Sequence, residues 1–239
     1  MQFGALINDL QVKSGKAFSE LEVVTKNITN ATTPGYKAER PISFDDIIDD
    51  SRTQRNMEAG KLSITNRPND VSLEGKGFFV LLDNNDETVL TRNLNLGTDK
   101  DGYLKSGENL VFPKVKVPEG FSDLEIAVDG SVLGKRPDGS QIKITDLQVV
   151  NYPAADKLDF DGSVYKPTDE AGKSLHVCLG PTSQTRVRQG ALEGSNVNGP
   201  KEFAIFRQMN QKISTYARIT QLLNTSQREY VRTLTGALG

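Results

Sequence analysis

The chain has 239 residues, with 29 Lys or Arg against 31 Asp or Glu and a formal net charge of −2 at pH 7. This balance lacks the strongly basic character typical of proteins that bind nucleic acids or anionic membranes. No apolar run reaches the roughly 18 residues needed to cross a bilayer, and the start lacks the pattern of a cleaved secretory signal. The single cysteine, Cys178, permits no internal disulfide, and the length allows one sizeable core or two modest domains.

The N-terminal stretch repeats apolar residues at alternating steps of four and three. This repeat predicts a helix over residues 3–31, about 42 Å long at 1.5 Å per residue. Residues 32–35, Thr-Thr-Pro-Gly, end the helix because proline removes a backbone donor and disfavours helical geometry in the preceding residue. The repeat positions, all apolar except the serine, are Phe3, Ile7, Leu10, Ser14, Ala17, Leu21, Val24 and Ile28.

A second repeat occupies the C-terminal end. Gly199-Pro200 precedes it and marks a helix start, since proline is tolerated in the first helical turn. Two such seams can pair as a coiled coil and still leave surface for neighbouring molecules. The alternative for either seam is an ordinary amphipathic helix that packs on its own domain. The C-terminal repeat positions are Phe206, Met209, Ile213, Tyr216, Thr220, Leu223, Gln227, Tyr230, Leu234 and Ala237.

Residues 38–69 are rich in charge. The part from 51 to 69 has few apolar residues, which predicts an extended or mobile arm that orders on contact with a partner. Four aspartates form two pairs around Ile47 and Ile48, and clustered carboxylates can bind a hard cation. Pairs of this kind are more often the solvated face of a short amphipathic segment. The four are Asp45, Asp46, Asp49 and Asp50.

From residue 70 the pattern changes to short alternating strands. Asp-Gly pairs between the alternating runs predict hairpins, so residues 70–185 are expected to form an all-β domain. His176 and Cys178 lie in an apolar run, where packing is expected rather than a zinc site. The region shows no catalytic constellation, and the glycines of Gly75-Lys76-Gly77 are explained by turn geometry. The predicted fold class is α+β, mainly β, with long terminal helices around a central all-β domain.

Three stretches together resemble the flagellar rod and hook family of axial proteins. Residues 27–37, Asn-Ile-Thr-Asn-Ala-Thr-Thr-Pro-Gly-Tyr-Lys, are similar to its N-terminal motif. Residues 75–82, with Thr91-Arg92 and residues 101–104, resemble its G-x-G-F-F-x-V … T-R … D-x-D-G-Y-L core. Residues 189–198, Gln-Gly-Ala-Leu-Glu-Gly-Ser-Asn-Val-Asn, resemble its C-terminal motif.

The resemblance implies a structural subunit of the bacterial flagellar basal-body rod. Such a subunit polymerises into the drive shaft through paired terminal helices, with the β domain outside them and the arm against adjacent subunits. The implied limits are 1–37 for the N-terminal helix and motif, 38–69 for the arm, 70–190 for the β domain and 191–239 for the C-terminal helix. The short β region favours a rod component over the larger hook protein, and the short chain without an extended insert favours the proximal rod over the distal rod.

The implied partners are further copies of the chain, other rod and axial proteins and the flagellar export apparatus, with no nucleic acid, membrane insertion, cofactor or metal. The implied location is the periplasm-spanning rod, reached by export without a cleaved signal peptide. Because isolated helices are marginal in water, both ends are expected to be largely disordered in the free monomer and to order on assembly. The implied subunit-interface residues are Phe3, Ile7, Leu10, Leu21, Val24, Ile28, Asn30, Pro34, Gly35, Tyr36, Ser195, Asn196, Val197, Phe206, Met209, Ile213, Tyr216, Leu223, Tyr230 and Leu234.

Two other functions stay open at this point. One is a coiled-coil adaptor whose β domain recognises a partner without forming a filament; it predicts a discrete dimer or trimer. The other is a hydrolase of cell-wall polymer, which needs an acid of raised pKa and a partner carboxylate in a cleft. The acidic residues of this chain lie in turn-like or charged contexts, which argues against the hydrolase.

Overall fold

The computed structural model describes residues 2–41, 53–121 and 123–236, and its contacts divide the chain into two units. The helical unit comprises Met1–Ala31, Glu39–Gln54 and Val197–Gly239, and the β unit comprises Thr32–Ala38 and Arg55–Asn196. The four aspartates at 45, 46, 49 and 50 lie outside the described residues. The two alternatives predicted for them, a solvated face of a short amphipathic segment and a cation site, therefore stay predictions. The limits given by the sequence motifs, 1–37, 38–69, 70–190 and 191–239, stay a prediction.

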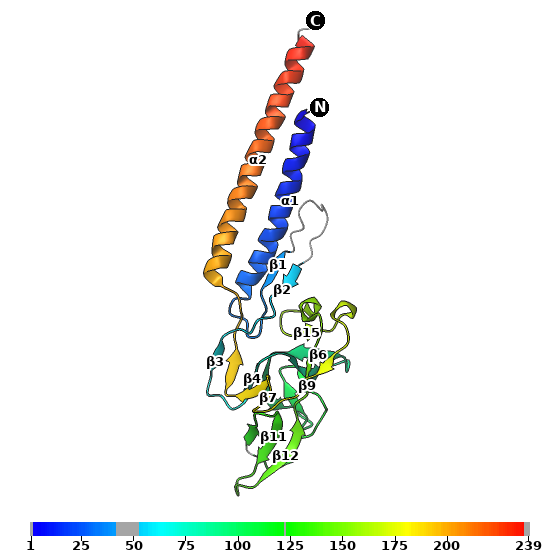
Figure 1. Ribbon diagram of the computed structural model, residues 1–239, viewed down its shortest axis with the longest axis vertical. Coiled ribbons are helices and arrows are strands. Elements are labelled where there is room, and N and C mark those ends of the chain that lie inside the picture. The colour runs from blue at the N-terminus through cyan, green and yellow to red at the C-terminus, as the bar shows by residue number, and fades with distance from the viewer. Residues whose placement is uncertain (1, 42–52, 122, 237–239) are drawn as a thin grey trace. The chain divides into compact units, whose positions relative to one another are not determined.

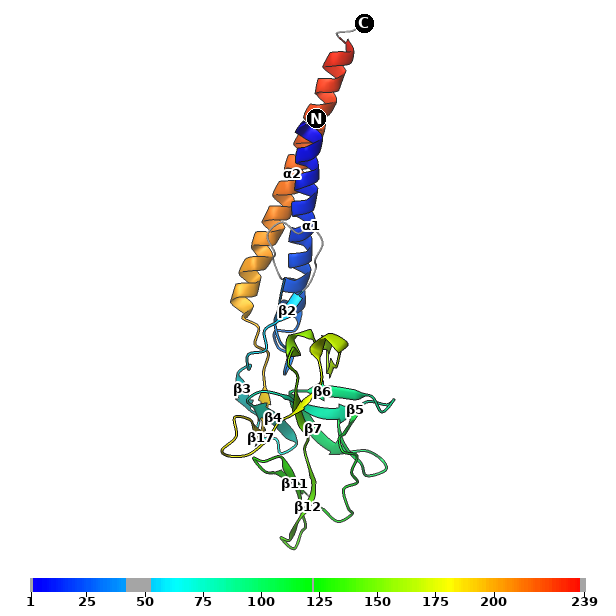
Figure 2. The ribbon, with the colours of Figure 1, turned by 45° about the vertical axis from the view of Figure 1, so that its right-hand side comes forward.

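Two long helices and a small ribbon make up the helical unit. Helix α1 spans Gln2–Thr29 and α2 spans Gly199–Gly236, close to the limits that the heptad repeats predict. They run antiparallel and pack side by side, as both views show (Figures 1 and 2). Strands β1 (Glu39–Pro41) and β2 (Thr53–Arg55) pair beside α1. The α+β class is therefore confirmed, while knobs-into-holes coiled-coil packing of α1 and α2 stays a prediction.

The β unit holds three groups of strands, and all pairs in the described ladders are antiparallel. The large sheet has the order β14-β15-β6-β5-β9-β8-β7-β4-β17, and β13 joins it by pairing with β5 and β16. A three-stranded sheet, β10-β11-β12, and a ribbon, β18-β3, complete the unit. The strands are β3 Leu62–Ile64, β4 Asp70–Glu74, β5 Phe78–Leu82, β6 Thr88–Thr91, β7 Asn93–Thr98, β8 Leu104–Ser106, β9 Asn109–Val111, β10 Asp123–Ile126, β11 Ser131–Lys135, β12 Gln141–Asp146, β13 Val149–Asn151, β14 Asp159–Phe160, β15 Tyr165–Lys166, β16 Leu175–His176, β17 Arg186–Gln189 and β18 Ala191–Glu193. Two short 3-10 helices, η1 Ala155–Lys157 and η2 Asp169–Ala171, lie between strands.

One apolar core lies among these strands. Leu94 and Leu96 of β7 alternate with exposed or half-buried neighbours, which is the pattern of a strand with one face on a core. The first four residues of β5 are buried, so that strand is covered on both faces. The buried cluster comprises Val71, Leu73, Phe79, Leu81, Val89, Leu94, Leu96, Leu104, Val111, Ile126, Val132, Leu147, Val149, Val164 and Val187.

The glycines at 75 and 77 serve backbone geometry, as the sequence predicts. Gly75 has a φ of +122°, and a Cβ there would lie 2.4 Å from the carbonyl oxygen of Gln184. Gly77 has a φ of +107° and approaches Val149 closely. Both values lie in the region that glycine adopts at little cost.

The structure corrects one prediction and adds several strands. The packing predicted for His176 and Cys178 is wrong, because β16 pairs only with β13 at an edge and both side chains are exposed. Among the described residues no group of three potential metal ligands occurs. The sequence analysis did not single out β7, whose leucines alternate with asparagines, or the short strands β1, β2, β3, β9, β14, β15, β17 and β18. No helix in the described ranges combines the length and apolarity that a membrane span requires.

Leu104 tests the core. It is 0% exposed, so Leu104→Ala is expected to lower the free energy of unfolding by about 2–5 kcal/mol through lost burial and a residual cavity. Urea unfolding followed by the near-UV tyrosine signal measures this. Leu175→Ala is the matched control, because Leu175 is 58% exposed and a change within about 0.5 kcal/mol is expected. Equal losses in the two variants would contradict this assignment of the core.

Candidate subunit interface

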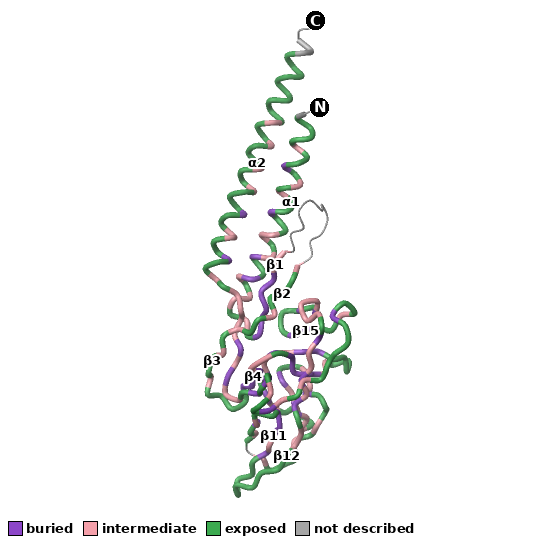
Figure 3. The backbone as a smooth tube through the Cα atoms, in the orientation of Figure 1, coloured by how far each residue is buried: buried purple, intermediate pink, exposed green. Residues whose placement is uncertain are grey.

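Helix α1 buries its heptad positions. Leu10, Ala17 and Val24 are 7%, 5% and 2% exposed, whereas most residues between them are exposed (Figure 3). Phe3, nearest the N-terminus, is 39% exposed. The repeat therefore identifies the face of α1 that packs within the helical unit. The remaining predicted positions Ile7, Leu21, Ile28 and Asn30 are half-buried.

Helix α2 follows its repeat for only part of its length. Met209 is 2% exposed, and the next predicted positions as far as Leu223 are half-buried. Beyond that point Gln227 is exposed and Tyr230 is 60% exposed. Leu234 lies within α2, but its side chain is outside the described part of the structure. The half-buried positions are Phe206, Ile213, Tyr216, Thr220 and Leu223.

The unequal lengths of the two helices account for this change. Helix α2 has 38 residues and α1 has 28, a difference equivalent to about 15 Å of helix. In both views the C-terminal end of α2 extends past the N-terminal end of α1 (Figures 1 and 2). Leu222, Tyr230 and Val231 are 59%, 60% and 52% exposed. We call these three side chains the α2 end patch.

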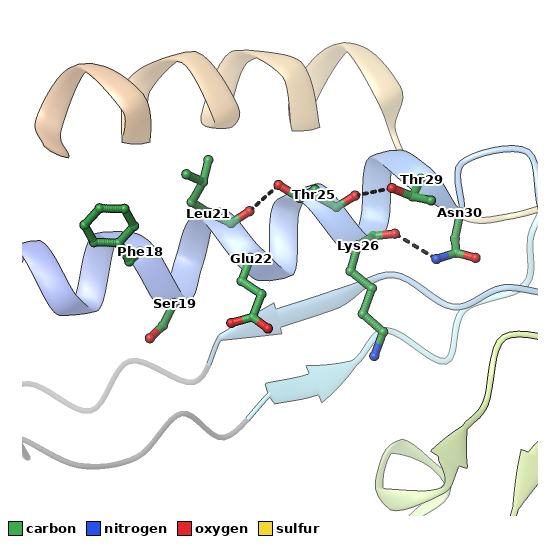
Figure 4. Close-up of a pocket in the computed structure, with 8 residues that line it drawn as sticks. All are labelled: Phe18, Ser19, Leu21, Glu22, Thr25, Lys26, Thr29 and Asn30. Atoms are coloured by element: carbon green, nitrogen blue, oxygen red, sulfur yellow. Dashed lines mark hydrogen bonds between the residues drawn. The ribbon is translucent and has the colours of Figure 1, made fainter. Parts of the chain in front are cut away.

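A groove follows the flank of α1 (Figure 4). Its volume is about 690 Å³, and Phe18 at one end is 55% exposed. The hydroxyls of Thr25 and Thr29 donate to the carbonyls of Leu21 and Thr25 at 2.7 and 2.9 Å, so these hydroxyls are satisfied within the helix. The groove therefore offers apolar surface beside two charged side chains. Its lining residues are Phe18, Ser19, Leu21, Glu22, Thr25, Lys26, Thr29 and Asn30.

The middle of the seam between α1 and α2 includes small polar side chains. A second groove of about 570 Å³ opens beside it, with Ser14 of α1 and Thr220 of α2 among its lining residues. Small polar side chains at seam positions bury less apolar surface than leucine or isoleucine does. The two helices are thus held together less strongly than a fully apolar seam would hold them.

A buried polar cluster fastens one end of the helix pair. The Asn27 amide group donates to the Glu39 carbonyl at 2.8 Å, and the Glu39 N–H donates to the Asn27 side-chain oxygen at 2.9 Å. The same amide group lies 3.3 Å from the Glu202 carboxylate, which Arg40 also contacts. Asn27 and Glu202 are both 0% exposed. Asn27 thus reproduces a strand-like pair of hydrogen bonds between α1 and β1.

The sequence analysis did not identify these residues as interface residues. For Asn27 the sequence signal was the position of a polar residue next to the helix seam, three residues after Val24. For Glu202 the signal was an acid in the first turn of α2, whose start Asn198 caps through a 3.1 Å bond from the Lys201 N–H. Neither pattern specifies its distant partner.

The motif residues at 34–36 lie in the β unit and have contacts within it. Tyr36 is 0% exposed and its ring stacks edge-on against Phe160 at 5.4 Å between centroids. Gly35 is also buried; its carbonyl accepts from the Tyr165 hydroxyl at 2.9 Å, while Pro34 is exposed. The structure thus gives Gly35 and Tyr36 an intramolecular role, and their contact with another subunit stays a prediction.

Asn196 joins the two motif segments inside the β unit. Its side-chain oxygen accepts from the Ala38 N–H at 2.7 Å, and its amide group donates to the carbonyls of Asn56 and Glu58 at 2.7 and 2.9 Å. Ser195 and Val197, the neighbouring predicted interface residues, are half-buried. One asparagine therefore connects the segment that follows α1 with the segment that precedes α2.

Asn27 tests the polar cluster of the helical unit. Asn27→Ala leaves the buried backbone groups of Glu39 without these side-chain bonds and is expected to lower the free energy of unfolding by about 1–3 kcal/mol. The loss of the helical circular-dichroism signal in urea, followed on the assembled chain, measures this. Asn210→Ala is the control, because Asn210 is exposed and bonds only to the Phe206 carbonyl of its own helix at 3.0 Å. A loss in the control as large as in Asn27→Ala would contradict the assignment.

Comparison with known proteins gives one family and several relatives. The model of the flagellar hook protein FlgE/F/G D1 domain matches residues 72–134, from β4 to β11 in the β unit. The chain is 27% identical over 201 residues to the flagellar basal-body rod protein FlgF of Salmonella typhimurium, which covers 77% of this chain and 80% of that protein. It is 25% identical over 243 residues to the flagellar basal-body rod protein FlgG of Caulobacter vibrioides, 85% of this chain and 92% of that protein. The FlgG of Bacillus subtilis is 26% identical over 77% of this chain and 82% of that protein.

The matched domain and the long alignments agree with the three sequence motifs. The alignments cover 77% and 85% of the chain, much more than the matched domain alone. The chain therefore resembles the flagellar rod and hook family of axial proteins, and the relatives that it matches over most of its length are named as the basal-body rod proteins FlgF and FlgG.

Proposed function

We propose that this chain is a structural subunit of the bacterial flagellar basal-body rod and polymerises through α1 and α2. The relatives are named as rod proteins, which supports a structural rather than an enzymatic role. The observation that carries the mechanism is the unequal helix pair, because α2 is longer than α1 and exposes Leu222 along its length and Tyr230 and Val231 nearer its C-terminal end.

The helical unit has the different surfaces that a polymer needs. A helical tube is a heterologous assembly, in which each subunit presents one surface to one neighbour and another surface to the next. The α2 end patch is one such surface, and the groove along α1 with exposed Phe18 is another. Covering these apolar side chains would stabilise the polymer by about 1.5–3 kcal/mol for each large side chain fully buried.

The weakly packed seam supports a change in order on assembly. A helix pair with Ser14 and Thr220 in its seam, and with one helix ten residues longer than the other, has little apolar packing to hold it in the free chain. Contacts with neighbouring subunits supply the missing packing. The helices of the free monomer would then be largely disordered, and polymerisation would wait until the chain reaches its assembly site.

The proposal extends to position and partners. The short chain, whose described residues 53–69 form only two short strands, supports a place in the proximal rod; the distal rod or a hook-type position is the alternative. Its partners are other copies, other rod and axial proteins, and the flagellar export apparatus. The location is the basal body, in the part of the rod that spans the periplasm.

The α2 end patch provides the test. Replacing Leu222 and Tyr230 by serine is expected to raise the concentration needed for polymerisation by at least about tenfold, because these side chains become buried only between subunits. Sedimentation and electron microscopy, with the chain alone and with isolated basal bodies, measure incorporation. The control is Leu175→Ser, which removes a leucine of similar exposure, 58%, from the β unit.

Two outcomes would contradict the proposal. One is polymerisation of the double variant at the concentration that suffices for the wild type. The other is a wild-type chain that forms only a discrete dimer or trimer under every condition and never incorporates, which would favour the coiled-coil adaptor.

A further inference from the structure

One carboxylate lies where three separate segments of the β unit meet. Glu193 of β18 is 0% exposed. Its Oε1 accepts from Lys37 Nζ at 2.6 Å and from the Gly60 N–H at 2.8 Å. Its Oε2 accepts from Arg92 Nε at 2.7 Å, and Arg92 Nη2 lies 2.6 Å from the same oxygen. Both oxygens of this carboxylate therefore accept from donor groups that belong to other segments.

Both cations are buried with it. The side chains of Lys37 and Arg92 are 1% and 4% exposed. Lys37 Nζ also donates to the Glu58 carbonyl at 2.6 Å, and Arg92 Nη2 donates to the Gly75 carbonyl at 2.7 Å. Each cation thus has neutral acceptors, but Glu193 is the negative charge that both share. Without it, two like charges would remain in an interior from which water is excluded.

Backbone contacts keep the carboxylate in this position. The Asn93 side chain accepts from the Glu193 N–H at 2.7 Å and donates to the Glu193 carbonyl at 2.9 Å, and the Gly35 N–H donates to that carbonyl at 2.8 Å. A Cβ on Gly60 would lie 1.9 Å from the carbonyl oxygen of Gly194, so a glycine is required where these two segments touch. The position of Glu193 is therefore determined by the sheet and by the strap, a name we give to residues 32–38.

We propose that Glu193 acts as a latch that holds the strap against the β unit. The segment that follows α1 and the segment that precedes α2 then become ordered together, and neither becomes ordered without the other. The strap brings Lys37 into the interior beside Arg92, and this is favourable only when the carboxylate of β18 is present. Lys37 and Arg92 come early in the chain and Glu193 comes late. The strap therefore does not dock on the β unit until residue 193 is available. This requirement couples the two ends of the chain, and the coupling does not depend on contacts between the two helices. This inference does not depend on the proposed function.

The titration of Lys37 gives an independent prediction. Burial lowers the pKa of Lys37 below its ordinary value of 10.5; Glu193 opposes this effect and Arg92 adds to it. The unfolded chain therefore binds more protons than the folded chain between the lowered pKa and 10.5. The free energy of unfolding of the wild type is expected to rise with pH in this window relative to Lys37→Met. Parallel pH profiles from urea unfolding of the two proteins would contradict the assignment.

Hydrogen exchange of the full-length chain tests the latch directly. In Glu193→Gln the amides of Ala38, Asn56 and Asn196, which bond across the strap, are expected to exchange on the order of a hundredfold faster. The Val80 amide, which bonds to the Gln148 carbonyl in the sheet, should keep its rate. Glu74→Gln is the matched control, because it removes only an exposed ion pair with Arg186, at 4.0 Å.

Adding Lys37→Met to Glu193→Gln separates charge from shape. If the uncompensated cations open the strap, the double variant should recover about tenfold or more of the lost protection. Unchanged strap exchange in Glu193→Gln, or faster exchange that Lys37→Met does not reverse, would overturn the proposal. If Glu193→Gln fails to fold, the double variant tests the proposal instead. A double variant that folds supports the latch, and a double variant that also fails to fold contradicts it.

Discussion

A buried carboxylate has to be fully paired, because leaving ionised groups uncompensated in a protein interior costs several kcal/mol. Glu193 meets this requirement with Lys37, Arg92 and the Gly60 N–H, which come from three segments far apart in the sequence. Because these groups meet at one carboxylate, the strap, the sheet and β18 are held together. The requirement also determines where the chain leaves the β unit on its way to each terminal helix.

The helical unit follows a different principle. Its seam is apolar at Leu10, Val24 and Met209 but polar at Ser14 and Thr220, and α2 is longer than its partner. Polar fastening is concentrated at one end, in the cluster around Asn27 and Glu202. The result is a helix pair whose buried polar contacts lie at one end and whose exposed apolar side chains lie toward the other. Such a pair is suited to gaining contacts from neighbouring subunits.

The sequence predicted the features that depend on local repetition. Heptads at Phe3–Ile28 and from Phe206 onward predicted both helices, and Asp-Gly turns predicted many of the strands. The glycines at 75 and 77 were predicted to serve turn geometry, and both have a positive φ. Tyr36 was predicted as a subunit-interface residue; it is buried within the β unit, and its contact with another subunit stays a prediction. The failed prediction at His176 came from an apolar run that lies at a sheet edge, and no local pattern distinguishes an edge from a core.

The residues that sequence reasoning missed act over long separations. Asn27 and Glu202 are 175 positions apart, and Lys37 and Glu193 are 156 apart. A lysine or a glutamate in a motif is usually solvated, so its burial becomes visible only when its partner is placed beside it. Strand β7 was missed because its core-facing leucines alternate with asparagines, which are depleted in strands.

Hydrogen exchange of α1 and α2 in the free monomer and in the assembled rod tests the central claim most directly. The account predicts that both helices exchange rapidly in the monomer and slowly in the rod, while the core of the β unit exchanges slowly in both. Slow exchange of both helices in the free monomer would contradict it, because the helix pair would then be stable without neighbouring subunits.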